Sequence, residues 1–208
     1  MTADRRLRIG GWAALLVAIV APLRIVALWT AVGSTGTAGA GDPWATQPYL
    51  IVDLVRIVGV LVAIVGLDGL FGSFEPSSAR MLLVVGGVGA GLGLAADVTT
   101  AAGLRPSVLE TVLVLAGDVL IAAWFIGGGL VLVRAGRQWA RVGWTACLGG
   151  IGQVLAAGSA AVGFGGPVGV TGTSLIDWFL LIGLFVVIYL VRVWRFVVGG
   201  RMPGPGLV

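Results

Sequence analysis

The stretch YLIVDLVRIVGVLVAIVGLDGLF, residues 49–71, decides the fold class of this chain. Only three of its residues are charged: Asp53, Arg56 and Asp68. Because an α-helix rises about 1.5 Å per residue, a run of this length crosses the ~30 Å hydrocarbon core of a bilayer. Its apolar residues are continuous rather than alternating, as they would be in a membrane β-strand. The stretch therefore predicts a transmembrane helix.

Five further stretches have the same character, at residues 11–32, 81–100, 108–133, 142–162 and 174–195. The segments between them are short and rich in Gly, Pro, Ser and Thr, and short connections place consecutive helices antiparallel. We therefore expect residues 1–208 to form one all-α domain, a polytopic transmembrane bundle of six spans with no separate soluble domain.

The composition supports a membrane protein and excludes several kinds of site. Hydrophobic residues make up 58% of the chain and charged residues 11%, whereas soluble domains contain about 25% charged residues. The chain has no His and no Lys, so imidazole metal sites, bis-His haem and a retinal Schiff base are impossible. Cys147 is the only cysteine, so no intramolecular disulfide can form. We expect no cofactor, no metal site and no catalytic residue.

The arginines predict the orientation. With the six spans above, ten of them lie on the side of the N-terminus and only Arg105 lies opposite; the ten are Arg5, Arg6, Arg8, Arg80, Arg134, Arg137, Arg141, Arg192, Arg195 and Arg201. Positive residues gather on the cytoplasmic side, so both termini are expected there, in the inner (plasma) membrane. The high isoelectric point comes from these arginines at the helix ends, so we expect no nucleic-acid partner. The first partner that we expect is the lipid bilayer.

Four charged residues lie well inside the spans, away from the span ends, and are the candidate site: Arg24, Asp53, Arg56 and Asp118. An arginine at the centre of a span costs about 2.5 to 3.5 kcal/mol, and an intramembrane charge is by default a sign of function. Arg24 should turn inward or extend to the outer interface, and Asp53 lies one turn from Arg56 on nearly the same helix face. All four fall in the outer half of the membrane.

The other acidic residues have ordinary explanations. Glu110 and Asp177 each follow a serine by three residues at the start of a span, which is the pattern of a capping box or its aspartate variant. Asp97, near the outer end of its span, and Asp68, near the inner end of its own, are expected to reach headgroups or water.

Two interpretations of the four buried charges remain open. They could form a salt-bridge network that only fixes the register of the helices, or line a polar pocket, open to the outer face, for a proton, an ion or a small charged solute. Gln153, midway along its span, would add hydrogen bonds to either arrangement. Buried ion pairs contribute little to stability after desolvation, which slightly favours the pocket.

Small residues repeat at four-residue spacing in two spans. The pairs are Gly87 with Gly91, Gly89 with Gly93, and Ala146 with Gly150. Such ridges let helix backbones approach closely. They favour residues 81–100 and 142–162 as the crowded centre of the bundle.

The segments IGGWAALLVAI, after an arginine-rich start, and GGGLVLVRAGRQWARVGW contain a turn, Arg134-Ala-Gly136-Arg137, followed by Ala140-Arg141-Val-Gly143. In these segments the chain resembles a group of six-helix bacterial integral membrane proteins to which no activity is assigned. The resemblance implies a six-helix bundle and nothing about chemistry.

Three functions are compatible with these observations. The first is a small transporter, channel or solute binder in which Asp53 and Asp118 take up a proton or cation. The second is a structural or accessory subunit of a larger membrane complex, bound to membrane-protein partners or to copies of itself. The third, an enzyme acting on a lipid or isoprenoid, is disfavoured because DDxxD-type clusters are absent and no Ser-His or Cys-His pair can form.

Overall fold

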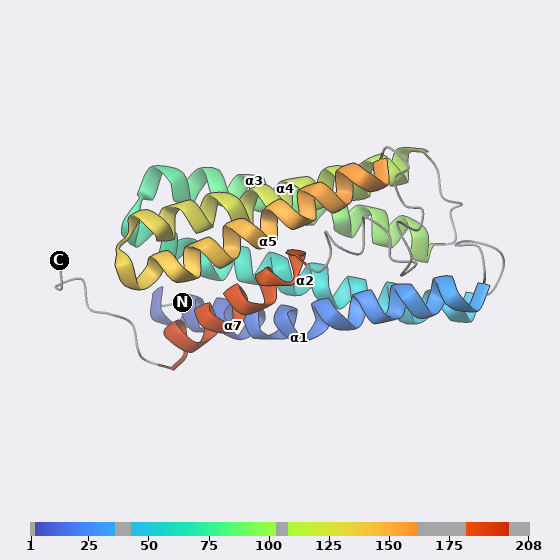
Figure 1. Cartoon of the computed structure of the whole chain (residues 1–208), viewed down its shortest axis with the longest axis horizontal. Coiled ribbons are helices and arrows are strands. Elements are labelled where there is room, and N and C mark those ends of the chain that lie inside the picture. The colour runs from blue at the N-terminus through green and yellow to red at the C-terminus, as the bar shows by residue number, and fades with distance from the viewer. Residues whose placement is uncertain (1–2, 36–42, 103–107, 162–181, 200–208) are drawn as a thin grey trace, which may run out of the picture.

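The computed structural model describes residues 3–35, 43–102, 108–161 and 182–199, and its regular elements within these ranges are all helices. They are α1 (Ala3–Thr35), α2 (Pro43–Phe74), α3 (Pro76–Ala101), α4 (Val108–Arg134), α5 (Arg137–Ala161) and α7 (Phe185–Val197) (Figure 1). The predicted all-α class is confirmed. The expected span at 174–195 lies partly outside the described residues, as do Arg105, Arg201 and the Ser174–Asp177 motif.

The helices pack in chain order and close on themselves. Each of α1 to α4 contacts the next helix along the chain, and α7 packs against both α5 and α1. In Figure 1 the pair α1 and α2 lies along one side and α3, α4 and α5 along the other, with α7 at an angle between them. Short connections explain this order because they leave each helix beside its predecessor.

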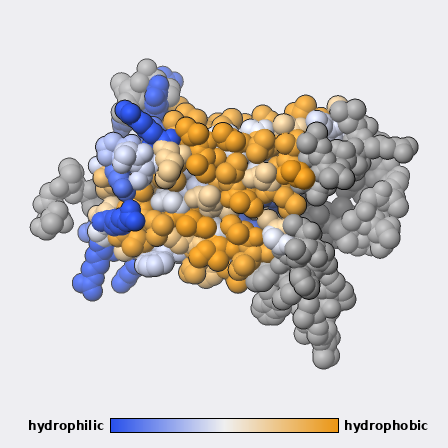
Figure 2. Space-filling view, turned by 90° about the horizontal axis from the view of Figure 1, so that it is seen from above, coloured by the Kyte–Doolittle hydropathy of each residue, from blue (hydrophilic) through white to orange (hydrophobic). Residues whose placement is uncertain are grey.

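Four of the helices are long and apolar enough to cross a membrane: Asp4–Arg24, Leu50–Phe74, Pro76–Ala101 and Val112–Arg134. Their outward side chains are largely apolar; Ile51 and Val84, for example, are 63% and 64% exposed. Figure 2 shows an apolar surface across the middle of the molecule and hydrophilic atoms gathered at one end. By length and composition these helices are typical of an integral membrane protein.

The hydrophilic end is where the first described helix begins and the last one ends. Gly11 of α1 faces Val197 and Val198, and the rings of Trp12 and Trp194 meet edge to face, 5.6 Å apart. Antiparallel packing brings nine arginines to this end, which we call the basic end: Arg5, Arg6, Arg8, Arg80, Arg134, Arg137, Arg141, Arg192 and Arg195.

The middle of the bundle is filled by aromatic rings. Trp124 of α4 packs edge to face against Phe71 at 5.9 Å and against Phe125 at 5.0 Å, and Phe125 meets Tyr189 of α7 at 5.8 Å. All four residues are at most 3% exposed. Such contacts add to the large area that each ring buries, so this aromatic layer holds α2, α4 and α7 together.

The glycine ridges are used unequally. A Cβ atom on Gly89 of α3 would lie 2.8 Å from the Leu120 Cβ, and one on Gly117 of α4 would lie 3.0 Å from the Gly93 nitrogen. Gly87 and Gly91 have nothing within 4 Å of such an atom. One ridge of α3 therefore packs on α4 while the other faces outward.

On the α5 side, Gly150 packs against the Ala122 carbonyl of α4. The expectation that α3 and α5 form the centre is wrong. Each of them packs between two neighbours, α3 between α2 and α4 and α5 between α4 and α7, so neither is enclosed by the other described helices.

Candidate functional site

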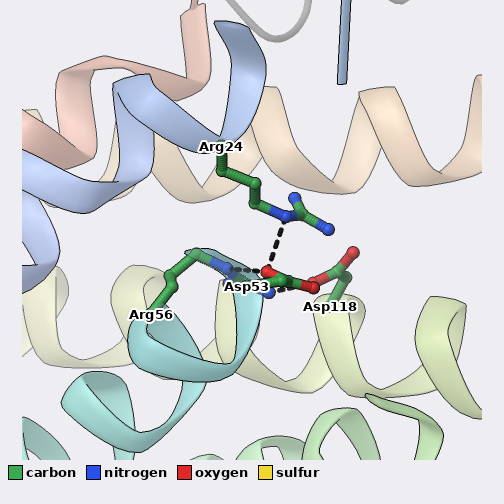
Figure 3. A network of polar contacts seen from close by, with 4 residues as sticks. All are labelled: Arg24, Asp53, Arg56 and Asp118. Atoms are coloured by element: carbon green, nitrogen blue, oxygen red, sulfur yellow. Dashed lines mark hydrogen bonds and ion pairs between the residues drawn. The ribbon is translucent and has the colours of Figure 1, made fainter. Parts of the chain in front are cut away.

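Three of the predicted site residues form one buried ion cluster. The Asp53 Oδ1 atom of α2 accepts a hydrogen bond from the Arg56 Nε, one turn along α2, at 2.5 Å, and it forms an ion pair with the Arg24 Nε of α1 at 2.7 Å (Figure 3). The Asp53 side chain is only 7% exposed. Arg24 thus turns inward, as one of its two predicted orientations required, because the carboxylate offers its guanidinium a partner that lipid lacks.

Asp118 joins the cluster from α4. Its Oδ1 lies 3.8 Å from the Arg56 Nη2, and Figure 3 shows its carboxylate directed toward Asp53 and Arg56. At 29% exposure the Asp118 side chain is the most accessible of the four. Arg56 therefore lies between two carboxylates, one buried and one partly open.

A fifth charge, which the sequence analysis assigned to the membrane boundary, belongs to the same cluster. Asp97 of α3 interacts electrostatically with Asp53, Arg56 and Arg24. Its Oδ2 atom is buried and has no hydrogen-bond donor among the described residues. Asp97 is partly exposed, so its contact with headgroups or water stays a prediction, and its interactions with Asp53 and Arg56 add a contact to α2 that was not predicted.

A signal for Asp97 was present in the sequence. Glu75, the residue between α2 and α3, is 22 residues after Asp53 and 22 residues before Asp97. In an antiparallel helical hairpin, residues equally far from the turn lie at the same height. Placing the turn at Glu75 would therefore have brought the two carboxylates level with each other.

The cluster lies at one level of the bundle, far from the basic end. Arg24 is 16 residues from Arg8, and Asp118 is 16 residues from Arg134, which corresponds to about 24 Å along each helix. Trp124 is six residues from Asp118, so the aromatic layer begins about 9 Å closer to the basic end. Rings that pack edge to face thus separate the charges from the basic end.

The five side chains, Arg24, Asp53, Arg56, Asp97 and Asp118, do not balance. When all are ionised, three carboxylates face two guanidinium groups, leaving one negative charge in excess. An unbalanced charge in a low-dielectric interior is costly, so the cluster favours taking up one positive charge. When one of two neighbouring carboxyl groups carries a proton, it can donate a hydrogen bond to the other, which accepts it.

Two further expectations concern metal binding and Gln153. Within the part of the chain that the structure describes, no group of three or more Asp, Glu, Cys or His residues is arranged to hold a metal ion. Gln153 of α5 lies beside Gly183, where a Cβ atom would be 3.5 Å from the Gln153 Cγ. It faces the segment before α7, and no described contact joins it to the charges.

No known protein family, curated protein or solved structure matches this chain. Within its described residues, the fold and the site define an all-helical protein with four helices long and apolar enough to cross a membrane and a cluster of charged side chains between its helices.

Proposed function

We propose that this chain is a small membrane transporter that takes up a proton at the cluster of Arg24, Asp53, Arg56, Asp97 and Asp118. It would span the inner membrane six times with both termini in the cytoplasm, which places the cluster toward the outer face. The supporting observation is the excess carboxylate: Asp97 adjoins Asp53 while both arginines already have acidic partners. A proton fits this arrangement better than a metal ion does, because it needs two neighbouring oxygens rather than several converging ligands.

The arginines would determine which carboxylate stays ionised and which one takes up the proton. Arg24 and Arg56 both bind the Oδ1 atom of Asp53, which stabilises its ionised form. Among the described residues Asp97 forms no ion pair within 4.0 Å, so it is the group that we expect to hold the exchangeable proton. Asp118, the most accessible carboxylate, would pass protons between the outer side and the buried pair.

The aromatic layer argues for a transporter rather than an open channel. Phe71, Trp124, Phe125 and Tyr189 fill the bundle between the cluster and the basic end. A proton bound at the cluster could therefore reach the cytoplasmic side only if helices move. Interfaces with glycine contacts, such as Gly89 on Gly117, would permit such sliding because they contain few interlocking side chains.

The test is proton flux into liposomes that contain the purified protein, an internal pH-sensitive dye and an imposed potassium diffusion potential. We expect the wild-type protein to acidify the interior faster than empty liposomes do, and Asp97→Asn to return the rate to that of empty liposomes. Asp68→Asn is the matched control: it makes the same chemical change in α2, 15 residues from Asp53 and toward the basic end. It should retain wild-type flux.

Other results would reject the proposal. Wild-type flux equal to that of empty liposomes would contradict transport of protons alone. Equal flux in the wild-type protein and Asp97→Asn would remove Asp97 from the pathway. If other polypeptides also co-purified in fixed stoichiometry, the account of the chain as an accessory subunit would replace this one.

A further inference from the structure

Four arginines converge on a cavity at the basic end, far from the charge cluster. The cavity has a volume of about 550 Å³ and is lined by Arg137 and Arg141 of α5 and by Arg192 and Arg195 of α7, with Phe196 as an apolar wall. None of these arginines forms an ion pair with a carboxylate of the described residues. By contrast, the neighbouring Arg134 is 3.7 Å from Glu75.

The first turn of α5 and the last turn of α7 both border the cavity. Gly136 has φ of +122°, and its carbonyl accepts the first hydrogen bonds of α5, from the nitrogens of Trp139 and Ala140. The N–H groups of Arg137 and Gln138 thus precede the helical ladder, at the positive end of the helix dipole. The Nη1 atom of Arg192 donates to the Arg141 carbonyl at 3.3 Å, which fixes α7 beside α5 at this point.

The surface next to the cavity is apolar. On α5, Trp144, Leu148 and Ile151 follow Arg141 at helical spacing and are 43% to 55% exposed. On α7, Val191 and Ile188 precede Arg192 and are also exposed. Because residues three and four apart share a helix face, both stripes extend from the arginines toward the middle of the membrane.

We propose that this cavity binds the phosphate of an anionic phospholipid, whose acyl chains lie along the two apolar stripes. Guanidinium groups bind phosphate with two parallel hydrogen bonds, and four of them without acidic partners match an anion. A free phosphate ion would use the arginines but not the stripes, so the stripes favour the lipid. Basic pockets between helices on the cytoplasmic side hold lipid headgroups in this way.

The experiment is native mass spectrometry of the purified full chain in micelles that contain equal amounts of phosphatidylglycerol and phosphatidylcholine. We expect wild type to retain phosphatidylglycerol in preference to phosphatidylcholine. Arg137→Gln/Arg195→Gln should bind it roughly 25-fold more weakly, since each basic residue near a membrane surface contributes about a fivefold factor. The control, Arg5→Gln/Arg80→Gln, removes the same charge from the basic end outside the cavity and should bind as wild type does.

A parallel titration with inorganic phosphate separates the two sources of the anion. The proposal is supported if inorganic phosphate displaces the lipid only at concentrations far above that of the lipid. Tight binding of phosphate with no preference for phosphatidylglycerol would overturn it, as would equal weakening in both double variants. Circular dichroism of both variants checks that they fold. If the cavity variant does not fold, Arg195→Gln alone is compared with Arg80→Gln, with a fivefold loss expected.

Discussion

Asp97 of α3 interacts electrostatically with Asp53 of α2 inside the bundle, although both residues are acidic. Asp53 is compensated, because its Oδ1 atom forms ion pairs with the Nε atoms of both Arg24 and Arg56. Asp97 is not compensated to the same degree, since its Oδ2 atom has no donor among the described residues. Neutralising Asp53 should therefore lower stability, whereas neutralising Asp97 should not. In a purely structural cluster both changes would lower it.

The first prediction concerns the stability of two matched variants. Asp53→Asn removes the charge that two buried guanidinium groups share and should lower the free energy of unfolding by about 3–5 kcal/mol, as expected for breaking a buried pair. Asp97→Asn removes an excess charge and should leave stability unchanged or raise it. Unfolding by a denaturing detergent measures both. A comparable loss in the two variants would indicate that Asp97 is part of a structural network.

A second prediction tests the packing of α3 on α4. Gly89→Ala places a Cβ atom 2.8 Å from that of Leu120, so the helices must separate, at a cost of about 1–3 kcal/mol. Gly91→Ala, two residues along the same helix, meets nothing within 4 Å and should be neutral or slightly stabilising. The same unfolding assay compares them. A loss at Gly91 would show that the outward ridge is also packed, against a partner or a second copy.

The third prediction concerns orientation in the membrane. The native Cys147 is buried and is first replaced by alanine. In that background, Gln138→Cys at the basic end should react with a membrane-impermeant maleimide only after the cytoplasmic side is exposed. Ala102→Cys, at the opposite end of α3, should react from the outside of intact cells. The reverse pattern would contradict the assignment of the basic end to the cytoplasm.

Much of the fold could be predicted because apolar run length is a direct physical constraint. The stretches 11–32, 49–71, 81–100 and 108–133 all lie within helices, and each helix extends beyond the expected span. What the sequence could not supply is the rotation of each helix about its axis. Gly87 and Gly89 are equivalent in the sequence pattern, yet only Gly89 faces α4.

The same reasoning explains the outcome for the candidate site. Arg24, Asp53, Arg56 and Asp118 were predicted because a charge inside a long apolar run is costly without a partner, and ion pairs join all four. Asp97 was missed because its position near a helix end allowed an ordinary explanation, and only its height relative to Asp53 reveals the contact. Gln153 is polar but uncharged, so it needs no charged partner. It lies beside Gly183 rather than beside the cluster.

The most direct test of the central claim is infrared difference spectroscopy of the protein in lipid, titrated with acid through the physiological range. We expect a carboxylic-acid C=O band that appears as the cluster takes up its proton. This band should be absent from Asp97→Asn and retained in Asp68→Asn. A band that persists in Asp97→Asn, or a wild-type protein with none, would contradict the claim that the Asp53 and Asp97 pair binds a proton.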